Sequence, residues 1–103
     1  MVARVDESAL ERLGRALADE SRRRILMELL DGPAYPAELA RRLGLGKANT
    51  SNHLTCLRGC GLVVAEPEGR RVRYEIADAR LADGLRVLAD VVVSIDPNCG
   101  HGR

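Results

Sequence analysis

Residues 36–59 read PAELARRLGLGKANTSNHLTCLRG, and they carry the pattern that most narrows the choice of fold. Pro36 suits the first turn of a short helix that continues through Leu43 and is closed by Gly44. A three-residue turn over 44–46 leads into a second helix from about Lys47 to Gly59. Two helices joined by a tight turn that contains glycine form the helix-turn-helix pattern.

Two further helices are predicted upstream of this pair. Ser8 and Glu11 have the spacing of a capping box, and leucines at 10, 13 and 17 follow at helical spacing. They predict a first helix over about 8–18. Asp19 can cap a second helix, which ends at Gly32-Pro33. Its apolar stripe consists of Ile25, Leu26, Leu29 and Leu30.

After Gly61 the period of the apolar residues changes from helical to two. Strands ending near Val64 and starting near Val72 are joined by a turn over 66–69, so a β-hairpin is predicted. A last helix begins near Asp78 and carries more apolar surface than one small core needs. The order ααααββα is a winged helix-turn-helix, mainly α with a small β-hairpin. The spare apolar face, with the first helix, is predicted to form a homodimer interface.

The chain is long enough for one compact domain, residues 1–103, with 1–7 and 96–103 as flexible tails. The longest uncharged apolar run is Val91–Val93, and the start of the chain lacks the apolar stretch of a signal peptide. These features exclude a membrane span and favour the cytoplasm. Neither a nucleophile–base constellation in a plausible pocket nor a glycine-rich phosphate loop is found, so an enzyme is not expected.

The net charge of +1 hides an uneven distribution. Residues 41–73 carry seven basic and two acidic side chains, a net charge of +5, and the remaining residues carry nine basic and thirteen acidic, a net charge of −4. A basic middle between acidic ends is the electrostatic footprint expected of a phosphate-binding surface. A merely solvated charged face is the alternative, and it applies most to Arg41 and Arg42.

The predicted helix over 47–59 is polar in its first half and apolar along its back. Asn49, Asn52 and His53 share one side, whereas Thr50 faces the other side with Leu54 and Leu57. Short polar side chains that can bond base edges are typical of a helix that enters the major groove. The candidate DNA-binding residues are Lys47, Asn49, Thr50, Ser51, Asn52 and His53, with Arg70 and Arg71 of the hairpin.

Three cysteines form the second candidate site. Cys56 and Cys60 are four residues apart, so their thiols emerge one helical turn apart on the side that follows the Asn49–His53 stripe. Cys99 lies in the tail beside His101. Thiols in a cytoplasmic protein indicate a soft-metal site more readily than a disulfide framework. Three sulfurs suit Cd(II) or Pb(II), and recruitment of His101 would suit Zn(II). Small buried cysteines that only pack remain the alternative.

Over about 8–96 the chain resembles the ArsR/SmtB family of bacterial metal-responsive repressors. The resemblance rests on Arg15–Asp19, Arg24–Leu30, Glu38–Leu45, Ser51–Leu54 and Leu57–Val63. Ser51–Val64 and Glu68–Tyr74 look like the cadmium- and lead-sensing branch of that family. The resemblance implies that Cys56, Cys60 and Cys99 bind the metal and that the apo dimer represses an operator until metal binds.

The chain departs from other branches of this family in three places. Residues 32–45 contain no cysteine, and residues 78–95 contain no pair of histidines, so two other metal sites of the family are absent. Gly46 stands at the start of the recognition helix where Ser or Thr is usual.

We therefore expect a homodimeric repressor that binds an inverted repeat in double-stranded DNA and is released when Cd(II) or Pb(II) binds. In this hypothesis the metal ties the recognition helix to the tail and moves it out of register with the groove. A redox-sensing repressor that forms a disulfide is one alternative. A constitutive DNA-binding protein whose cysteines only pack is another.

Overall fold

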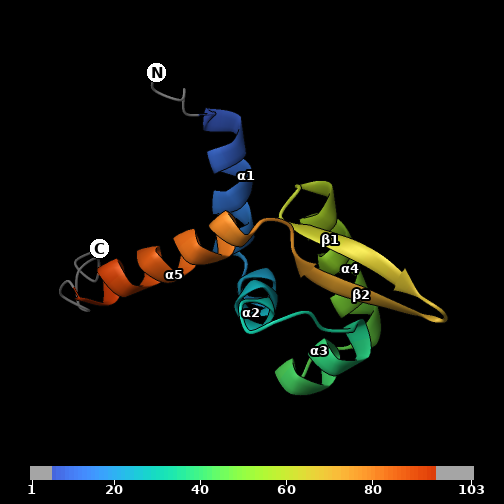
Figure 1. The fold of residues 1–103 in the computed structure, drawn as a ribbon. Coiled ribbons are helices and arrows are strands. Elements are labelled where there is room, and N and C mark those ends of the chain that lie inside the picture. Colours follow the sequence, from blue (N-terminus) through green and yellow to red (C-terminus); the bar gives the residue numbers. More distant parts are fainter. Residues whose placement is uncertain (1–5, 95–103) are drawn as a thin grey trace.

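The structure is a computed structural model, and it describes residues 6–94 (Figure 1). Its elements follow the predicted order ααααββα. They are α1 (Glu7–Ala18), α2 (Glu20–Leu29), α3 (Pro36–Leu43), α4 (Lys47–Gly59), β1 (Val63–Glu68), β2 (Arg71–Ile76) and α5 (Ala79–Ser94). The predicted winged helix-turn-helix is confirmed, because α3 and α4 are followed directly by a two-stranded antiparallel hairpin.

Helix α2 lies at the centre of the molecule, and its apolar side packs against α3, α4 and the hairpin (Figure 1). The side chains that are fully buried come from all of these elements. They include Ile25, Leu26, Leu39, Leu54, Leu57 and Val63. Because α4 contributes both Leu54 and Leu57, one side of this helix is fixed to the core and the opposite side faces outward.

The predicted start of the first helix is wrong by one residue. Asp6 is the N-cap, and its carboxylate accepts a hydrogen bond from the backbone N–H of Ala9 at 3.2 Å. Ser8 and Glu11 do not form a capping box, since each accepts a side-chain hydrogen bond from an arginine one turn later, Arg12 and Arg15. Asp is as good an N-cap as Ser, so the helix begins at Glu7, which the sequence assigned to the tail.

The turn of the hairpin is also shorter than predicted. Residues 66–68 belong to β1 and pair with residues 73–71 of β2, so the chain reverses at Gly69 and Arg70 alone. Gly69 has a φ of +62°, which glycine adopts without strain and which the tight hairpin turn requires. The hairpin is tied to the segment before α3 by two backbone hydrogen bonds between Ala34 and Tyr74, of 2.8 and 2.9 Å.

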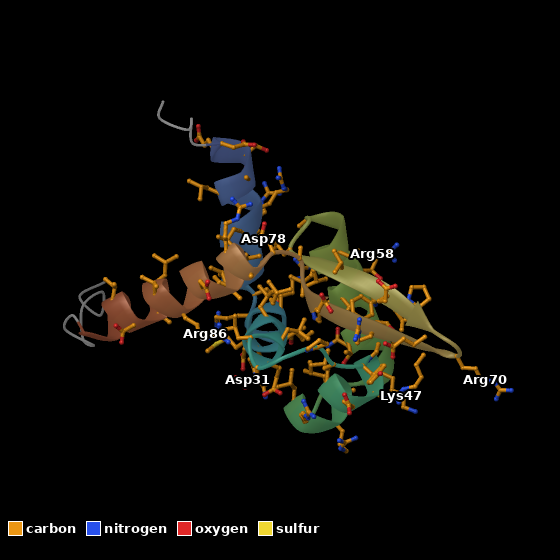
Figure 2. All side chains as sticks on the ribbon, viewed as in Figure 1. Asp31, Lys47, Arg58, Arg70, Asp78 and Arg86 are labelled. Carbon is orange, nitrogen blue, oxygen red and sulfur yellow. The ribbon has the colours of Figure 1, made fainter. Side chains whose placement is uncertain are left out.

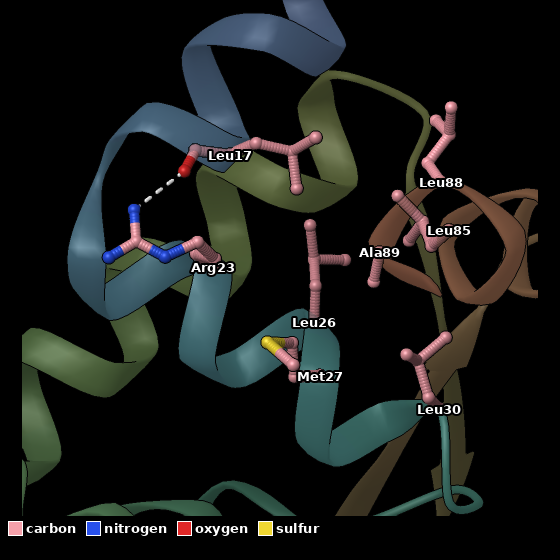
Figure 3. Close-up of a pocket in the computed structure, with 8 residues that line it drawn as sticks. All are labelled: Leu17, Arg23, Leu26, Met27, Leu30, Leu85, Leu88 and Ala89. Atoms are coloured by element: carbon pink, nitrogen blue, oxygen red, sulfur yellow. Dashed lines mark hydrogen bonds between the residues drawn. The ribbon is translucent and has the colours of Figure 1, made fainter. Parts of the chain in front are cut away.

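Helix α5 extends from the body in the direction opposite to the hairpin and packs mainly against β2 (Figure 1). Val87 and Leu88 on this helix are 60% and 55% exposed, and Leu10 of α1 is 55% exposed. An apolar groove of about 380 Å³ separates α5 from α2, and Leu26, Met27, Leu85 and Leu88 line it (Figure 3). The single chain therefore leaves apolar surface on α1 and α5 uncovered. No helix within residues 6–94 is long and apolar enough to cross a membrane.

Replacement of Leu54 with alanine should lower the free energy of unfolding by about 2–5 kcal/mol, because it opens a cavity where α4 meets the core. The measurement is urea denaturation followed by circular dichroism. Val64→Ala is the control, since Val64 is exposed on the hairpin and should cost much less. Equal losses for the two variants would contradict the role of α4 in the core.

Candidate DNA interface and metal site

The first half of α4 presents a polar face to solvent. Lys47, Asn49, Ser51 and Asn52 are exposed, and His53 is half-buried. Side chains of this length that face away from the core can bond base edges or phosphates in a major groove. Lys47 at the start of α4 and Arg70 at the tip of the hairpin both extend away from the ribbon (Figure 2).

Thr50 was predicted to contact DNA, but the structure gives it a different role. It is fully buried, and its hydroxyl donates a hydrogen bond to the carbonyl of Gly46 at 2.9 Å. The side chain therefore points into the protein and reaches no base, so its assignment to the DNA-binding set is wrong. Gly46 has no side chain with which to cap α4, and the hydroxyl of Thr50 instead ties the first turn of the helix to the cap residue.

The two hairpin arginines lie in different surroundings. Arg70 is exposed at the tip of the hairpin. The guanidinium of Arg71 lies over the ring of Tyr35, 3.4 Å from its centroid. The Tyr35 hydroxyl donates to Glu68 at 2.6 Å, and this hydrogen bond raises the pKa of Tyr35. Arg71 is thus held against the body of the protein, whereas Arg70 is placed to reach beyond it.

The two arginines of α3 also differ. Arg42 forms an ion pair with Glu28 of α2 at 3.6 Å, which favours the solvating role for Arg42 over a contact with phosphate. Arg41 is exposed.

Cys56 and Cys60 lie on consecutive turns at the C-terminal end of α4. The backbone N–H of Cys60 donates to the carbonyl of Cys56 at 3.0 Å, so the helical turn between them is intact. Cys56 is exposed and Cys60 is half-buried, and both are free thiols. They open onto the same pocket of about 300 Å³. Two accessible thiols on one pocket are donors of the type that a thiophilic ion prefers.

Three arginines surround this pocket, and the sequence patterns did not indicate them. Arg12 and Arg15 come from α1 and Arg22 from α2. Arg22 donates to the Cys56 sulfur at 3.5 Å and to Nδ1 of His53 at 3.2 Å. Asp19 caps α2 beside them, and its hydrogen bond from the backbone N–H of Arg22 holds the pKa of that carboxyl below its usual value.

A third ligand is not found among the residues described. Within 6–94 the structure brings together no group of three His, Cys, Asp or Glu side chains that could hold a metal ion. Cys99 and His101 lie outside the described residues. Residues 6–94 therefore provide two of the three predicted ligands, side by side.

Comparison with known proteins places this arrangement in a family. Residues 19–64 match the family described as bacterial regulatory protein, arsR family. Over 90 residues the chain is 63% identical to the HTH-type transcriptional regulator CmtR of Mycobacterium tuberculosis, an alignment that covers 87% of this chain and 76% of CmtR. The chain belongs to the ArsR family. It is therefore a winged helix-turn-helix transcriptional regulator, like its relatives.

Solved structures and a second relative agree with this assignment. The solution structure of CmtR, described as a cadmium metal-sensor from M. tuberculosis, matches with a TM-score of 0.68 over 80% of this chain and 85% of that one. A homodimeric winged helix-turn-helix domain from Mycobacterium bovis, a possible ArsR-family regulator, is 30% identical with a TM-score of 0.78, and the match covers 100% of this chain and 99% of that one. A probable mercury resistance operon repressor of Streptomyces lividans is 40% identical over 72 residues, 70% of this chain and 58% of the repressor.

Replacement of Thr50 with valine tests whether this residue is structural. Valine keeps the shape of the side chain and removes the hydrogen bond to Gly46, so the free energy of unfolding should fall by about 1 kcal/mol. DNA affinity should stay within a few-fold of the wild-type value, whereas Asn52→Ala, the control at an exposed position, should lower it clearly. The measurements are thermal melting and fluorescence anisotropy with duplex DNA. A large loss of affinity in a folded Thr50→Val protein would contradict the structural role.

Proposed function

We propose that this chain forms a homodimeric repressor that leaves its operator when a thiophilic metal ion binds Cys56, Cys60 and Cys99. One observation carries the proposal: two free thiols share a pocket at the end of the same helix whose exposed first half is suited to DNA. The likeness to CmtR, a cadmium sensor, supports it. A change at one end of a helix can alter how its other end docks in a groove.

The proposed ligand set determines the class of metal. Thiolates select soft ions such as Cd(II) or Pb(II) over Mg²⁺ and Ca²⁺. A fourth ligand from His101 would make the set suitable for Zn(II). Cys99 completes the site in this proposal, from the same chain or from the other copy in the dimer. The protein would supply the sulfur ligands, and a bound ion would link them by coordination.

DNA recognition in this proposal uses the exposed polar face of α4 together with the hairpin. The contacts come from Lys47, Asn49, Ser51, Asn52, His53, Arg70 and Arg71. Two such faces related by a two-fold axis would read an inverted repeat whose half-sites are about 34–36 Å apart or a multiple of that distance. Bacterial DNA lies in the cytoplasm, which stays the predicted location of the protein.

The dimer would form through the uncovered apolar surface of α1 and α5. Val87, Leu88 and Leu10 are more than half exposed, and a second copy is the partner that a symmetric regulator needs for two half-sites. The homodimeric relative from M. bovis supports this proposal.

The metal site can be tested by titrating reduced, metal-free protein with Cd(II) and following thiolate-to-metal absorption in the ultraviolet. We expect an intense band that saturates at one Cd(II) per protomer and that is reduced in both Cys56→Ser and Cys99→Ser. Thr55→Ser, at an exposed position of the same helix, is the control and should leave the band unchanged. Affinity should fall as the pH falls, because the ligands bind as thiolates.

Two results would contradict the metal site. The absence of a band would leave a DNA-binding protein that responds to another signal. Release of DNA by an oxidant acting on metal-free protein would support the thiol-redox alternative instead.

Replacement of Val87 with aspartate tests the interface. A charge buried in an apolar interface is costly, so the variant should be monomeric at concentrations where the wild type is dimeric, and its DNA affinity should fall. Sedimentation velocity measures the oligomeric state. Val64→Asp, another exposed valine but on the hairpin, should remain a dimer. A dimeric Val87→Asp protein would place the interface elsewhere.

A further inference from the structure

A single guanidinium joins the two candidate sites on α4. Arg22, in the first half of α2, donates from Nε to Nδ1 of His53 at 3.2 Å and from Nη2 to Sγ of Cys56 at 3.5 Å. His53 belongs to the proposed DNA-binding set, and Cys56 to the proposed metal ligands. The two residues are three apart, so they face the same neighbour on successive turns of α4.

The backbone that carries the Arg22 side chain is held in place. Its backbone N–H donates to the carboxylate of Asp19, the N-cap of α2, at 3.0 Å. Ile25 and Leu26, in the next turn of α2, are fully buried. Arg22 can therefore change its hydrogen bonds only by turning its own side chain, because the helix that carries it is anchored in the core.

The hydrogen bond to His53 has a definite direction. An arginine side chain only donates hydrogen bonds, so Nδ1 of His53 must be the acceptor and carries no proton. The neutral imidazole then has its proton on Nε2. The second nitrogen is thus set as a donor, which suits a phosphate oxygen or the acceptor edge of guanine. Arg22 fixes both the orientation and the tautomer of a half-buried ring on the helix that reads DNA.

The two hydrogen bonds of Arg22 cannot be changed independently. The guanidinium is planar, so its Nε and Nη2 hydrogens keep a fixed geometry relative to each other. The sulfur of a cysteine thiol, here that of Cys56, is a weak acceptor for Nη2. Conversion of that thiol to an anionic ligand that is shared with Cys60 changes the charge and the position of the acceptor. If Nη2 moves to follow this acceptor, the rigid guanidinium also moves Nε relative to Nδ1 of His53.

We propose that Arg22 is a positioning residue that transmits the metal state of Cys56 to His53, and through His53 to the DNA. This inference rests on the proposed function, because it requires metal at Cys56 and DNA contact at His53. In the metal-free protein Arg22 holds His53 ready for DNA. When Cys56 becomes a metal ligand, the hydrogen bond from Arg22 to His53 is altered, and the contact between His53 and the DNA is lost.

Arg22→Met tests this link, because methionine keeps much of the bulk and removes both hydrogen bonds. The probe is a labelled duplex selected by the metal-free wild-type protein from a random pool, and its dissociation constant is measured by anisotropy with and without Cd(II). For the wild type we expect Cd(II) to weaken binding by a factor within about 5–150. For Arg22→Met we expect metal-free binding to be weakened already, with the Cd(II) factor reduced to about threefold or less.

Arg15→Met is the matched control. Arg15 lines the same pocket, but its guanidinium is paired with Glu11 at 2.8 Å, whereas the hydrogen bonds to His53 and Cys56 come from Arg22. In this variant Cd(II) should weaken DNA binding by the same factor as in the wild type. Arg22→Lys retains the charge without the two-pronged geometry, so it should behave like Arg22→Met. A wild-type factor in either Arg22 variant would overturn the inference.

The tautomer of His53 gives a readout that involves no DNA. In ¹⁵N-labelled metal-free wild type, nitrogen chemical shifts should show the Nε2–H tautomer for His53, with His101→Gln used to assign the two histidines. Cd(II) should change these shifts in the wild type and in Arg15→Met, but much less in Arg22→Met. An Nδ1–H tautomer in the metal-free wild type would overturn the inference.

Failure of the inference can be separated from failure of the proposed function. If Cd(II) leaves DNA binding of the wild type unchanged, the proposed function fails and the inference fails with it. If Cd(II) releases DNA equally from the wild type and from folded Arg22→Met, only the inference fails. Circular dichroism of each variant confirms that it is folded.

Discussion

The packing of one side of α4 against the core determines which residues of this helix are presented to solvent. Thr50, Leu54 and Leu57 are fully buried, and they lie along one side of the helix at intervals of three and four residues. Helix α4 therefore cannot rotate about its axis without exposing apolar side chains. Its other side is fixed as the outward face, and both candidate sites lie there or at its edge.

This constraint explains how one short helix can serve two purposes. The polar residues stand in its first half, where a helix end can enter a groove, and the thiols stand at its C-terminal end beside α1 and α2. In the proposed function, this distance along the helix would keep DNA and a metal ion from competing for the same atoms. Because the helix is rigid and anchored, a change in how its end is held by neighbouring elements alters how its beginning is presented. Arg22 of α2 is the neighbour that contacts both His53 and Cys56.

The sequence predicted the fold well because its signals are local. The turn at Gly44 to Gly46 and the apolar spacing of α4 concern residues only a few positions apart, and the bounds of α3 and α4 agree with the structure. The errors also concern local choices. Asp6 rather than Ser8 is the N-cap of α1, and residues 66–68 extend β1 instead of forming the turn. Thr50 was placed on the apolar back by helical periodicity, yet it was included with the DNA-binding residues because its chemistry suits bases.

The surroundings of the thiols could not be predicted in this way. The sequence placed Cys56 and Cys60 on one side of a helix, but it gave no indication of Arg22, which is 31 residues from His53 and 34 from Cys56. Such contacts depend on how α2 packs across α4, and no short motif records it. The place of Cys99 depends on residues outside the described range and stays a prediction.

In the proposed function, metal at the thiols and DNA at the first half of α4 oppose each other. Coupling between two sites is reciprocal, so the direct measurement is the affinity for Cd(II) of the wild-type dimer with and without saturating operator duplex, by competition with a chelator. We predict that DNA-bound protein binds Cd(II) more weakly, by the same factor by which Cd(II) weakens DNA binding. Equal Cd(II) affinities for the free and DNA-bound protein would contradict it.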